Sequence, residues 1–231
     1  MPAVLPDTPV VEAAIIDLTN TFRGQQKLGA LTANPGLKAA ARAYAAYLAK
    51  SGQFSHTADG RAVGDRVSSA GYTWCQVGEN LSMHLSSAGF ESRALAQKAV
   101  EGWINSPPHR ANLVAPNMTD IGVGVVRAPG KDPKFISVQL FGRPQSLQYE
   151  FQISNTTRAS VGYEFGGETH DLGPSHAVTH SACNPGEISF DTFGGRRLSM
   201  RYQALDGLVY RLKSDEDSGL KIEITPLERV R

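Results

Sequence analysis

The sequence has few of the features that assign a chain at once to a specialised class of protein. Among its 231 residues there are only two cysteines, Cys75 and Cys183, which allow at most one disulfide and do not fix the redox compartment. No run approaches the ~20 apolar residues of a membrane-spanning helix. The first ten residues lack the basic and long apolar segments of a signal peptide, so none is predicted there.

An excess of charge of one sign is also missing. The chain carries 23 Lys and Arg against 22 Asp and Glu, which gives a formal net charge of +1. Phosphate binding needs a local excess of basic side chains, so we expect no nucleic-acid partner. The hydrophobic fraction of 41% is ordinary for a globular protein and is sufficient for the cores of one large or two small domains.

Helical periodicity dominates the first part of the chain. Helices are predicted to start at Thr8-Pro9 and at Asn34-Pro35, where a capping side chain precedes a proline. The second of these helices is predicted to end at Gly52. Further helices are expected over residues 62–69 and 92–105, because apolar residues recur there at helical spacing.

Strand signals follow the last of these helices, which should stop at Pro107-Pro108 because a helix interior does not accommodate proline. Residues 121–126 and 135–142 are short, rich in β-forming residues and joined by the turn sequence APGKDP. Helices around a small sheet predict an α/β fold, in which strand 121–126 is covered on both faces.

Composition changes after Arg143-Pro144. Seven segments then read as strands separated by polar turns: LQYEFQIS, ASVGYEFG, HAVTH, EISFDTF, LSMRYQAL, LVYRLK and LKIEITPL. Several short alternating strands at regular spacing are typical of a β-sandwich or barrel. We therefore predict two domains, an α/β domain over residues 1–143 and a smaller all-β, sandwich-like domain over residues 144–231.

Three polar residues of the first domain stand at the edges of apolar elements. His56 follows the second predicted helix, Glu79 lies in VGENL, and His109 follows the two prolines. Two imidazoles and a carboxylate could bind one divalent metal or carry out acid–base chemistry on a bound water. Each also has a structural interpretation: His56 as a helix cap, Glu79 as an acceptor for N–H groups of a buried loop, and His109 as a turn cap. The long spacing contains no H-E-x-x-H motif and does not decide between them.

A second group of histidines lies in the predicted β domain. His176, His180 and Cys183 have a short spacing that suggests metal ligands, but a strand would place the two histidines on one face and Cys183 on the other. Surface histidines and a small buried thiol are therefore favoured. A disulfide between Cys75 and Cys183 stays open.

Four segments, in order and at compatible distances, resemble one known family. They are LTANPGLKAAARAYAAYLAKSGQFSHT, VGENL, AVEGWINSPPHRANLVAPNMTDIGVGVV and FISVQLFG. Together they span about residues 11–142 and are similar to the CAP superfamily of cysteine-rich secretory proteins, antigen 5 and pathogenesis-related protein 1, in its bacterial SCP-like branch. The resemblance implies a three-layer α-β-α sandwich with a surface cleft, where some members bind zinc with two His and two Glu.

The resemblance assigns only part of that tetrad to this chain. His56 matches the first histidine, and Glu79 matches the glutamate of the G-E-N motif, which also contains Asn80. Ser106 stands where eukaryotic members have the second glutamate, and the H-[YF]-T-Q motif of the second histidine is absent. The bacterial S-P-x-H-R variant offers His109 instead. The implied cleft residues are thus His56, Glu79, His109, Ser106 and Asn80, and the candidate zinc ligands are His56 and His109.

These residues favour a non-catalytic, exported binding protein over an enzyme. By family likeness its ligand would be a lipid, an envelope component or another protein, and its place would be secreted, periplasmic or at the cell surface of a bacterium. The alternative is a zinc-dependent hydrolase or peptidase that uses the same cleft. Against that alternative, the sequence shows no recognisable nucleophile arrangement, since Ser55 adjoins His56 and adjacency is poor geometry for a Ser–His pair. A purely structural envelope protein is a third interpretation.

Overall fold

The computed structural model describes residues 3–215 and 219–227, which divide into two compact units with a boundary between Ser146 and Leu147. The first unit is built on a four-stranded sheet in the order β1-β3-β4-β2. Its strands are β1 (Thr32–Ala33), β2 (Trp74–Leu85), β3 (Asp120–Ala128) and β4 (Lys134–Pro144). β1 pairs with β3 in parallel, and the other pairs are antiparallel. The predicted strand 121–126 therefore lies inside the sheet, as expected.

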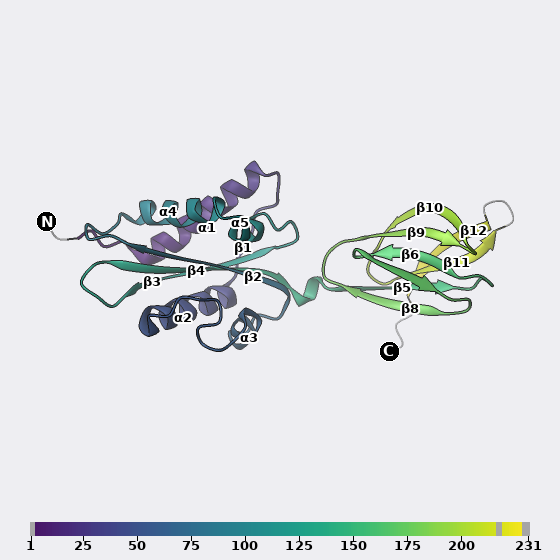
Figure 1. Ribbon diagram of the computed structural model, residues 1–231, viewed down its shortest axis with the longest axis horizontal. Helices are drawn as coiled ribbons and strands as arrows, with labels where there is room; N and C mark the ends of the chain where they lie inside the picture. Colours follow the sequence, from purple (N-terminus) through teal and green to yellow (C-terminus); the bar gives the residue numbers. More distant parts are fainter. Residues whose placement is uncertain (1–2, 216–218, 228–231) are drawn as a thin grey trace. The chain divides into compact units, whose positions relative to one another are not determined.

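Helices cover both faces of this sheet. Figure 1 shows α1, α4 and α5 on one face and α2 and α3 on the other. Their bounds are α1 (Thr8–Gln25), α2 (Pro35–Ser51), α3 (Val63–Ser69), α4 (Ser92–Ile104) and α5 (Pro107–Leu113). Each face has its own hydrophobic core, one around Trp103 and the other around Tyr44. The prediction of a three-layer α-β-α sandwich is confirmed.

Two glycines of β3 allow α2 to approach the sheet closely. A Cβ atom at Gly122 would lie 2.3 Å from the backbone of Leu37, and one at Gly124 would lie 2.3 Å from the backbone nitrogen of Arg42. Real Cβ contacts are essentially never this short, so any side chain at either position would have to push the helix away. The alternation of glycine and valine in IGVGVV thus fixes the distance between α2 and the sheet.

The helix boundaries depart from the sequence prediction in two places. Asp7, not Thr8, is the N-cap of α1, and its side chain accepts a hydrogen bond from the backbone N–H of Val10. The Pro107-Pro108 pair does end α4, but it also starts α5, which the sequence did not predict. Proline is favoured in the first turn of a helix, where its missing N–H has no partner to lose.

In the second unit, residues 147–215 and 219–227 form eight strands in two four-stranded sheets, ordered β10-β9-β6-β7 and β12-β11-β5-β8. Their bounds are β5 (Tyr149–Asn155), β6 (Val161–Phe165), β7 (Glu168–Leu172), β8 (Ala177–Ala182), β9 (Glu187–Phe193), β10 (Arg196–Gln203), β11 (Leu208–Asp215) and β12 (Gly219–Pro226). One core of aromatic and aliphatic side chains from both sheets holds the unit together. The prediction of an all-β, sandwich-like domain is confirmed, although β7 was not among the predicted strands.

Candidate functional site

The site begins at the loop that follows α2. That helix ends at Ser51 with Gly52 as its C-cap, and the N–H of Gly52 donates to the carbonyl of Leu48. His56 lies four positions farther on, in a turn, with 56% of its side chain exposed. The interpretation of His56 as a cap of the helix end is therefore wrong, because glycine already performs that role.

Two tyrosines of α2 hold this loop in place. The Tyr44 hydroxyl donates to the carbonyl of Ser55 at 2.6 Å and accepts from the N–H of Ala58 at 3.1 Å. The Tyr47 hydroxyl donates to the carbonyl of Ala58 at 3.0 Å. Residues on both sides of His56 are thus tied to one helix, which fixes the place of the imidazole.

Glu79 connects the loop to the sheet. It lies on β2 with only 3% of its side chain exposed. Its Oε1 is 2.8 Å from Nδ1 of His56, and its Oε2 accepts from Nη2 of Arg66 at 2.7 Å. The interpretation of Glu79 as an acceptor for N–H groups of a buried loop is wrong, because it belongs to a strand and bonds two side chains. A buried carboxylate needs such partners to remain charged.

Arg66, on α3, is the centre of the cluster, and the sequence prediction missed it. Its guanidinium lies 3.6 Å from the centroid of the Tyr44 ring, and its Nη1 donates to Asp59 Oδ1 at 3.1 Å. With only 6% of its side chain exposed, Arg66 pairs with two carboxylates, those of Asp59 and Glu79. A planar guanidinium can bond several acceptors and stack on a ring at the same time, which a lysine cannot do.

The other half of the site comes from α5. Ser106 is the N-cap of this helix, and its Oγ lies 2.9 Å from Nδ1 of His109. Burial lowers the pKa of His109 below its ordinary value, and the charge of the nearby His56 lowers it further. His109 is therefore biased toward the neutral form.

Two amide side chains join α5 to the G-E-N strand. Asn80 is fully buried and donates to the carbonyl of His109 at 3.1 Å. Asn112, a second residue that the sequence prediction missed, donates to the carbonyl of Glu79 at 3.1 Å and to Oδ1 of Asn80 at 2.9 Å. A Cβ atom at Gly78 would lie 3.0 Å from Oδ1 of Asn112, so the glycine gives this amide its room. Each residue of G-E-N thus has a separate structural task.

The residues present do not fit a zinc ion. Both oxygens of Glu79 already bond side chains, and one of those partners is the permanent cation Arg66. A guanidinium at this distance repels a second cation. Within residues 3–215 and 219–227, no group of three or more His, Cys, Asp and Glu is arranged to hold a metal. The geometry gives the zinc hydrolase alternative no support.

The histidines of the second unit have structural partners. Nδ1 of the exposed His176 lies 2.8 Å from the carbonyl of Pro174, and Nε2 of His180 lies 2.7 Å from the hydroxyl of Tyr163. Burial lowers the pKa of the half-buried His180. The expectation of a free buried thiol at Cys183 is wrong, because both cysteines are disulfide-bonded.

The three-layer sandwich and the strand that carries the G-E-N motif define the first unit as a CAP domain. The chain belongs to the cysteine-rich secretory protein family: the CAP family model matches residues 16–141, more than half of the chain.

Two curated relatives come from Bacillus subtilis (strain 168). The uncharacterized protein YkwD is 30% identical over 118 residues, which cover 51% of this chain and 43% of YkwD. The uncharacterized membrane protein YlbC is 30% identical over 117 residues, which cover 50% of this chain and 32% of YlbC. This chain therefore spans less than half of either relative.

Solved structures of similar chains include two bacterial proteins. An extracellular protein containing an SCP domain from Bacillus anthracis is 27% identical, with a TM-score of 0.49 over 59% of this chain and 41% of that one. An outer surface protein from Borrelia burgdorferi is 21% identical, with a TM-score of 0.49 over 57% of this chain and 90% of that one. No helix among the described residues of the present chain is long and apolar enough to cross a membrane.

Proposed function

We propose that the chain is an exported binding protein, whose first domain captures a ligand at a cleft formed by His56, Glu79, His109, Ser106 and Asn80. The observation that supports this proposal is the contrast between the two ends of the cluster. The imidazole of His56 is more than half exposed, whereas the Glu79 and Arg66 side chains that hold it are almost fully buried. A buried ion pair that fixes the orientation of an exposed ring makes that ring a rigid recognition element.

A binding role accounts for this arrangement better than catalysis does. Glu79 is committed to Arg66 and His56 through its two oxygens, so it has no free oxygen to serve as a general base. Nδ1 of His109 faces Ser106, and the contact of His56 with Glu79 also uses Nδ1, which leaves Nε2 of each ring for a ligand. The Glu79 carboxylate only accepts hydrogen bonds, so Nδ1 of His56 donates to it, and in the neutral ring Nε2 then accepts, which suits a ligand that carries a hydroxyl or amide donor.

Export to the cell exterior, the periplasm or the cell surface is part of the same proposal. It is supported by membership of a family described as secretory and by the bonding of both cysteines in disulfides, which persist in oxidising compartments. We assign the first unit, predicted over residues 1–143, to the CAP domain, and the second unit, predicted over residues 144–231, to an accessory domain that offers a second contact surface. The proposed ligand is an envelope component, such as a lipid or a wall polymer, or else a protein of the same compartment.

Cosedimentation of the purified full chain with isolated peptidoglycan and with phosphatidylglycerol vesicles tests the proposal. His56→Ala should reduce several-fold the fraction of protein that sediments with peptidoglycan or with the vesicles, whichever the parent binds. Its unfolding midpoint in urea should change little because the ring is exposed. His176→Ala, which removes an exposed histidine of the second unit, is the matched control and should bind as the parent does. Equal binding by the parent and His56→Ala would refute the role of His56.

A further inference from the structure

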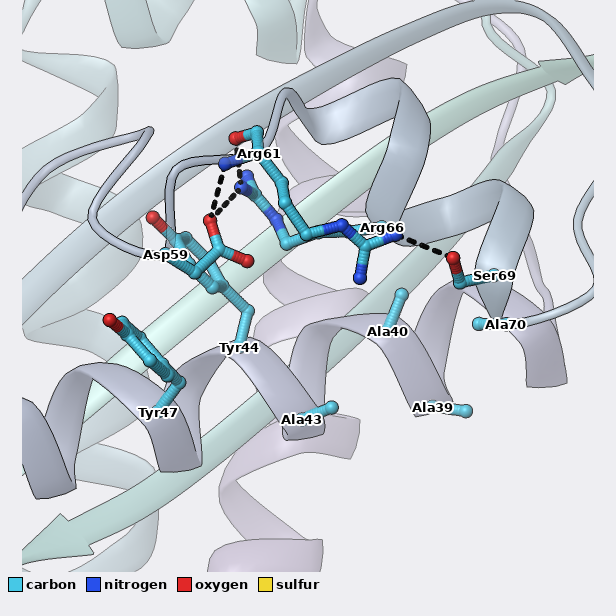
Figure 2. Close-up of a pocket in the computed structure, with 10 residues that line it drawn as sticks. All are labelled: Ala39, Ala40, Ala43, Tyr44, Tyr47, Asp59, Arg61, Arg66, Ser69 and Ala70. Atoms are coloured by element: carbon cyan, nitrogen blue, oxygen red, sulfur yellow. Dashed lines mark hydrogen bonds and ion pairs between the residues drawn. The ribbon is translucent and has the colours of Figure 1, made fainter.

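A cavity lies beside α2 and α3, and Arg66 is one of its lining residues. Its volume is about 420 Å³, which is within the range of small-molecule sites. Figure 2 shows Ala39, Ala40 and Ala43 of α2 along one side and the side chain of Arg61 extended across from them. None of the proposed cleft residues lines this cavity, so it is distinct from the site proposed above.

The walls of the cavity suit an apolar body. Three alanines give α2 a smooth, shallow surface there, and the ring of Tyr47 continues it. The ring of Tyr47 stacks on that of Tyr44, with centroids 6.3 Å apart and planes inclined by only 8°. Tyr44 is only 2% exposed and has the Arg66 guanidinium 3.6 Å from its ring centroid, so Tyr47, which is 40% exposed, is the ring that a ligand can reach. Tyrosine rings of this kind contact aliphatic and aromatic groups at a low cost in side-chain entropy.

The lining of the cavity contains two guanidiniums, those of Arg61 and Arg66, and one carboxylate, that of Asp59, which pairs with Arg66. The lining therefore keeps an excess of one positive charge, which suits an anion. Arg61 donates through Nη2 to the carbonyl of Asp65 at 2.8 Å and to Oγ of Ser69 at 2.5 Å, both neutral acceptors. Among the described residues no carboxylate lies within ion-pair distance of Arg61, in contrast to Arg66, which has two. Because Asp59 pairs with Arg66 and the side chain of Arg61 bonds neutral partners, Arg61 is the guanidinium of the lining that is left to pair with a ligand carboxylate.

The second guanidinium of the cavity has a spare donor. Nε of Arg66 is buried and has no hydrogen-bond partner in the part of the chain that the structure describes. An unpaired buried donor carries a free-energy cost that a ligand acceptor relieves. This donor belongs to a side chain that lines the cavity and is only 6% exposed. A buried polar group without a partner calls for an explanation, and a ligand-binding site provides one.

We propose that this cavity binds a small amphipathic carboxylate. Its carboxylate pairs with Arg61, a small shift of the Arg66 side chain brings Nε toward one carboxylate oxygen, and the apolar body of the ligand lies on the alanines and on the ring of Tyr47. The carboxylate could belong to an alkyl or an aryl acid, since both bodies match the walls. This site does not depend on the ligand of the His56 cluster.

Isothermal titration calorimetry of the full chain with octanoate and with 3-phenylpropionate tests the proposal, and 1-octanol and 3-phenyl-1-propanol serve as uncharged counterparts. Saturable binding of either acid, at least about tenfold tighter than its alcohol, is expected because a guanidinium–carboxylate pair is a charge-assisted bond. Comparison of the affinities of the two acids shows whether the cavity binds an alkyl or an aryl group more tightly. No saturable heat with either acid, or equal affinity for acid and alcohol, would overturn the proposal.

Two pairs of variants locate the binding. Arg61→Gln should weaken the preferred acid about tenfold or more, whereas Arg93→Gln, at a position on α4 away from the lining, should not. Ala43→Phe should fill the cavity and abolish binding, whereas Ala46→Phe, on the same helix but outside the lining, should bind as the parent does. Both alanines are exposed, so both variants should fold, and circular dichroism checks this. Loss of binding in Ala46→Phe as well, or full binding in Ala43→Phe, would place the ligand elsewhere and overturn the proposal.

Discussion

At the scale of single residues, Glu79 is held between an arginine and a histidine of very different exposure. Its Oε2 faces a guanidinium that is almost fully buried, and its Oε1 faces an imidazole in contact with solvent. Such a carboxylate contributes little net stability relative to an apolar residue, because its desolvation offsets the Coulomb attraction. Its removal alone is costly, however, because Arg66 then stays buried with less compensation.

Glu79→Gln should therefore lower the free energy of unfolding by about 3 kcal/mol, the lower end of the range for breaking a buried ion pair. The lower end applies because Asp59 still faces Arg66 at 3.1 Å and the new amide oxygen can accept one hydrogen bond. The measurement is the urea concentration at which the first unit is half unfolded, compared with the parent at an unchanged m-value.

Glu101→Gln is the control for this variant. Glu101 is exposed on α4, so the same change of charge should alter stability by less than about 0.5 kcal/mol. If the two variants unfold at the same midpoint, the ion pair between Glu79 and Arg66 is not formed in solution.

The sequence motifs anticipated some residues of the cluster and missed others. His56 and Glu79 were found because they stand in segments with family likeness, and the structure brings them to 2.8 Å. Arg66 lies outside those segments, and Asn112 stands in the segment that contains His109 but belongs to no motif of the implied tetrad: an arginine in a short helix and an asparagine after a histidine are ordinary surface patterns. Their roles depend on pairing with β2, which is a long-range contact that local sequence does not encode.

At the scale of elements, β2 shows why strand prediction from pattern is incomplete. Its twelve residues include Gly78, Glu79 and Asn80, which lower strand propensity, and its exposure does not alternate cleanly. The ladder with β4 along its length overrides this weak local preference. By contrast, β3 and β4 were predicted correctly because both faces are covered and their sequences are largely apolar.

The packing of α2 on β3 gives the element-scale prediction. Gly124→Ala places a methyl group 2.3 Å from the nitrogen of Arg42 and 2.4 Å from the carbonyl carbon of Ala41. Both are backbone atoms, which cannot rotate away, so the helix must move and the free energy of unfolding should fall by about 1–3 kcal/mol. Chemical denaturation of the full chain measures this loss.

Gly102→Ala is the matched control for the same chemical change. Gly102 lies within α4, and apart from its chain neighbours and the adjacent helix backbone, no heavy atom of the described residues comes within 4 Å of the added methyl group. This variant should raise stability by about 0.5–1 kcal/mol, because alanine loses less conformational entropy than glycine in a helix. Equal effects of the two variants would show that α2 does not approach β3 as closely as described.

At the scale of the whole molecule, the chain has separate hydrophobic cores in its two units. The two cores of the first unit share no residue with the core of the second. Composition alone revealed this division, since helical periodicity gives way to alternating segments after Arg143. It could not place the end of β4, which runs to Pro144 and is followed by a 3-10 turn over Gln145–Leu147.

Separate cores predict separate unfolding. In the presence of a reducing agent, which removes the constraint of the bonded cysteines, scanning calorimetry of the full chain should show two transitions. The fragments 1–146 and 147–231 should each unfold cooperatively within about 5 °C of one of them, because a shift of that size corresponds to only ~1 kcal/mol in a small domain. An equimolar mixture of the two fragments is the control and should reproduce the pattern of the reduced full chain. A single transition in the full chain, or a fragment that does not unfold cooperatively, would mean that the two cores stabilise each other rather than fold as independent domains.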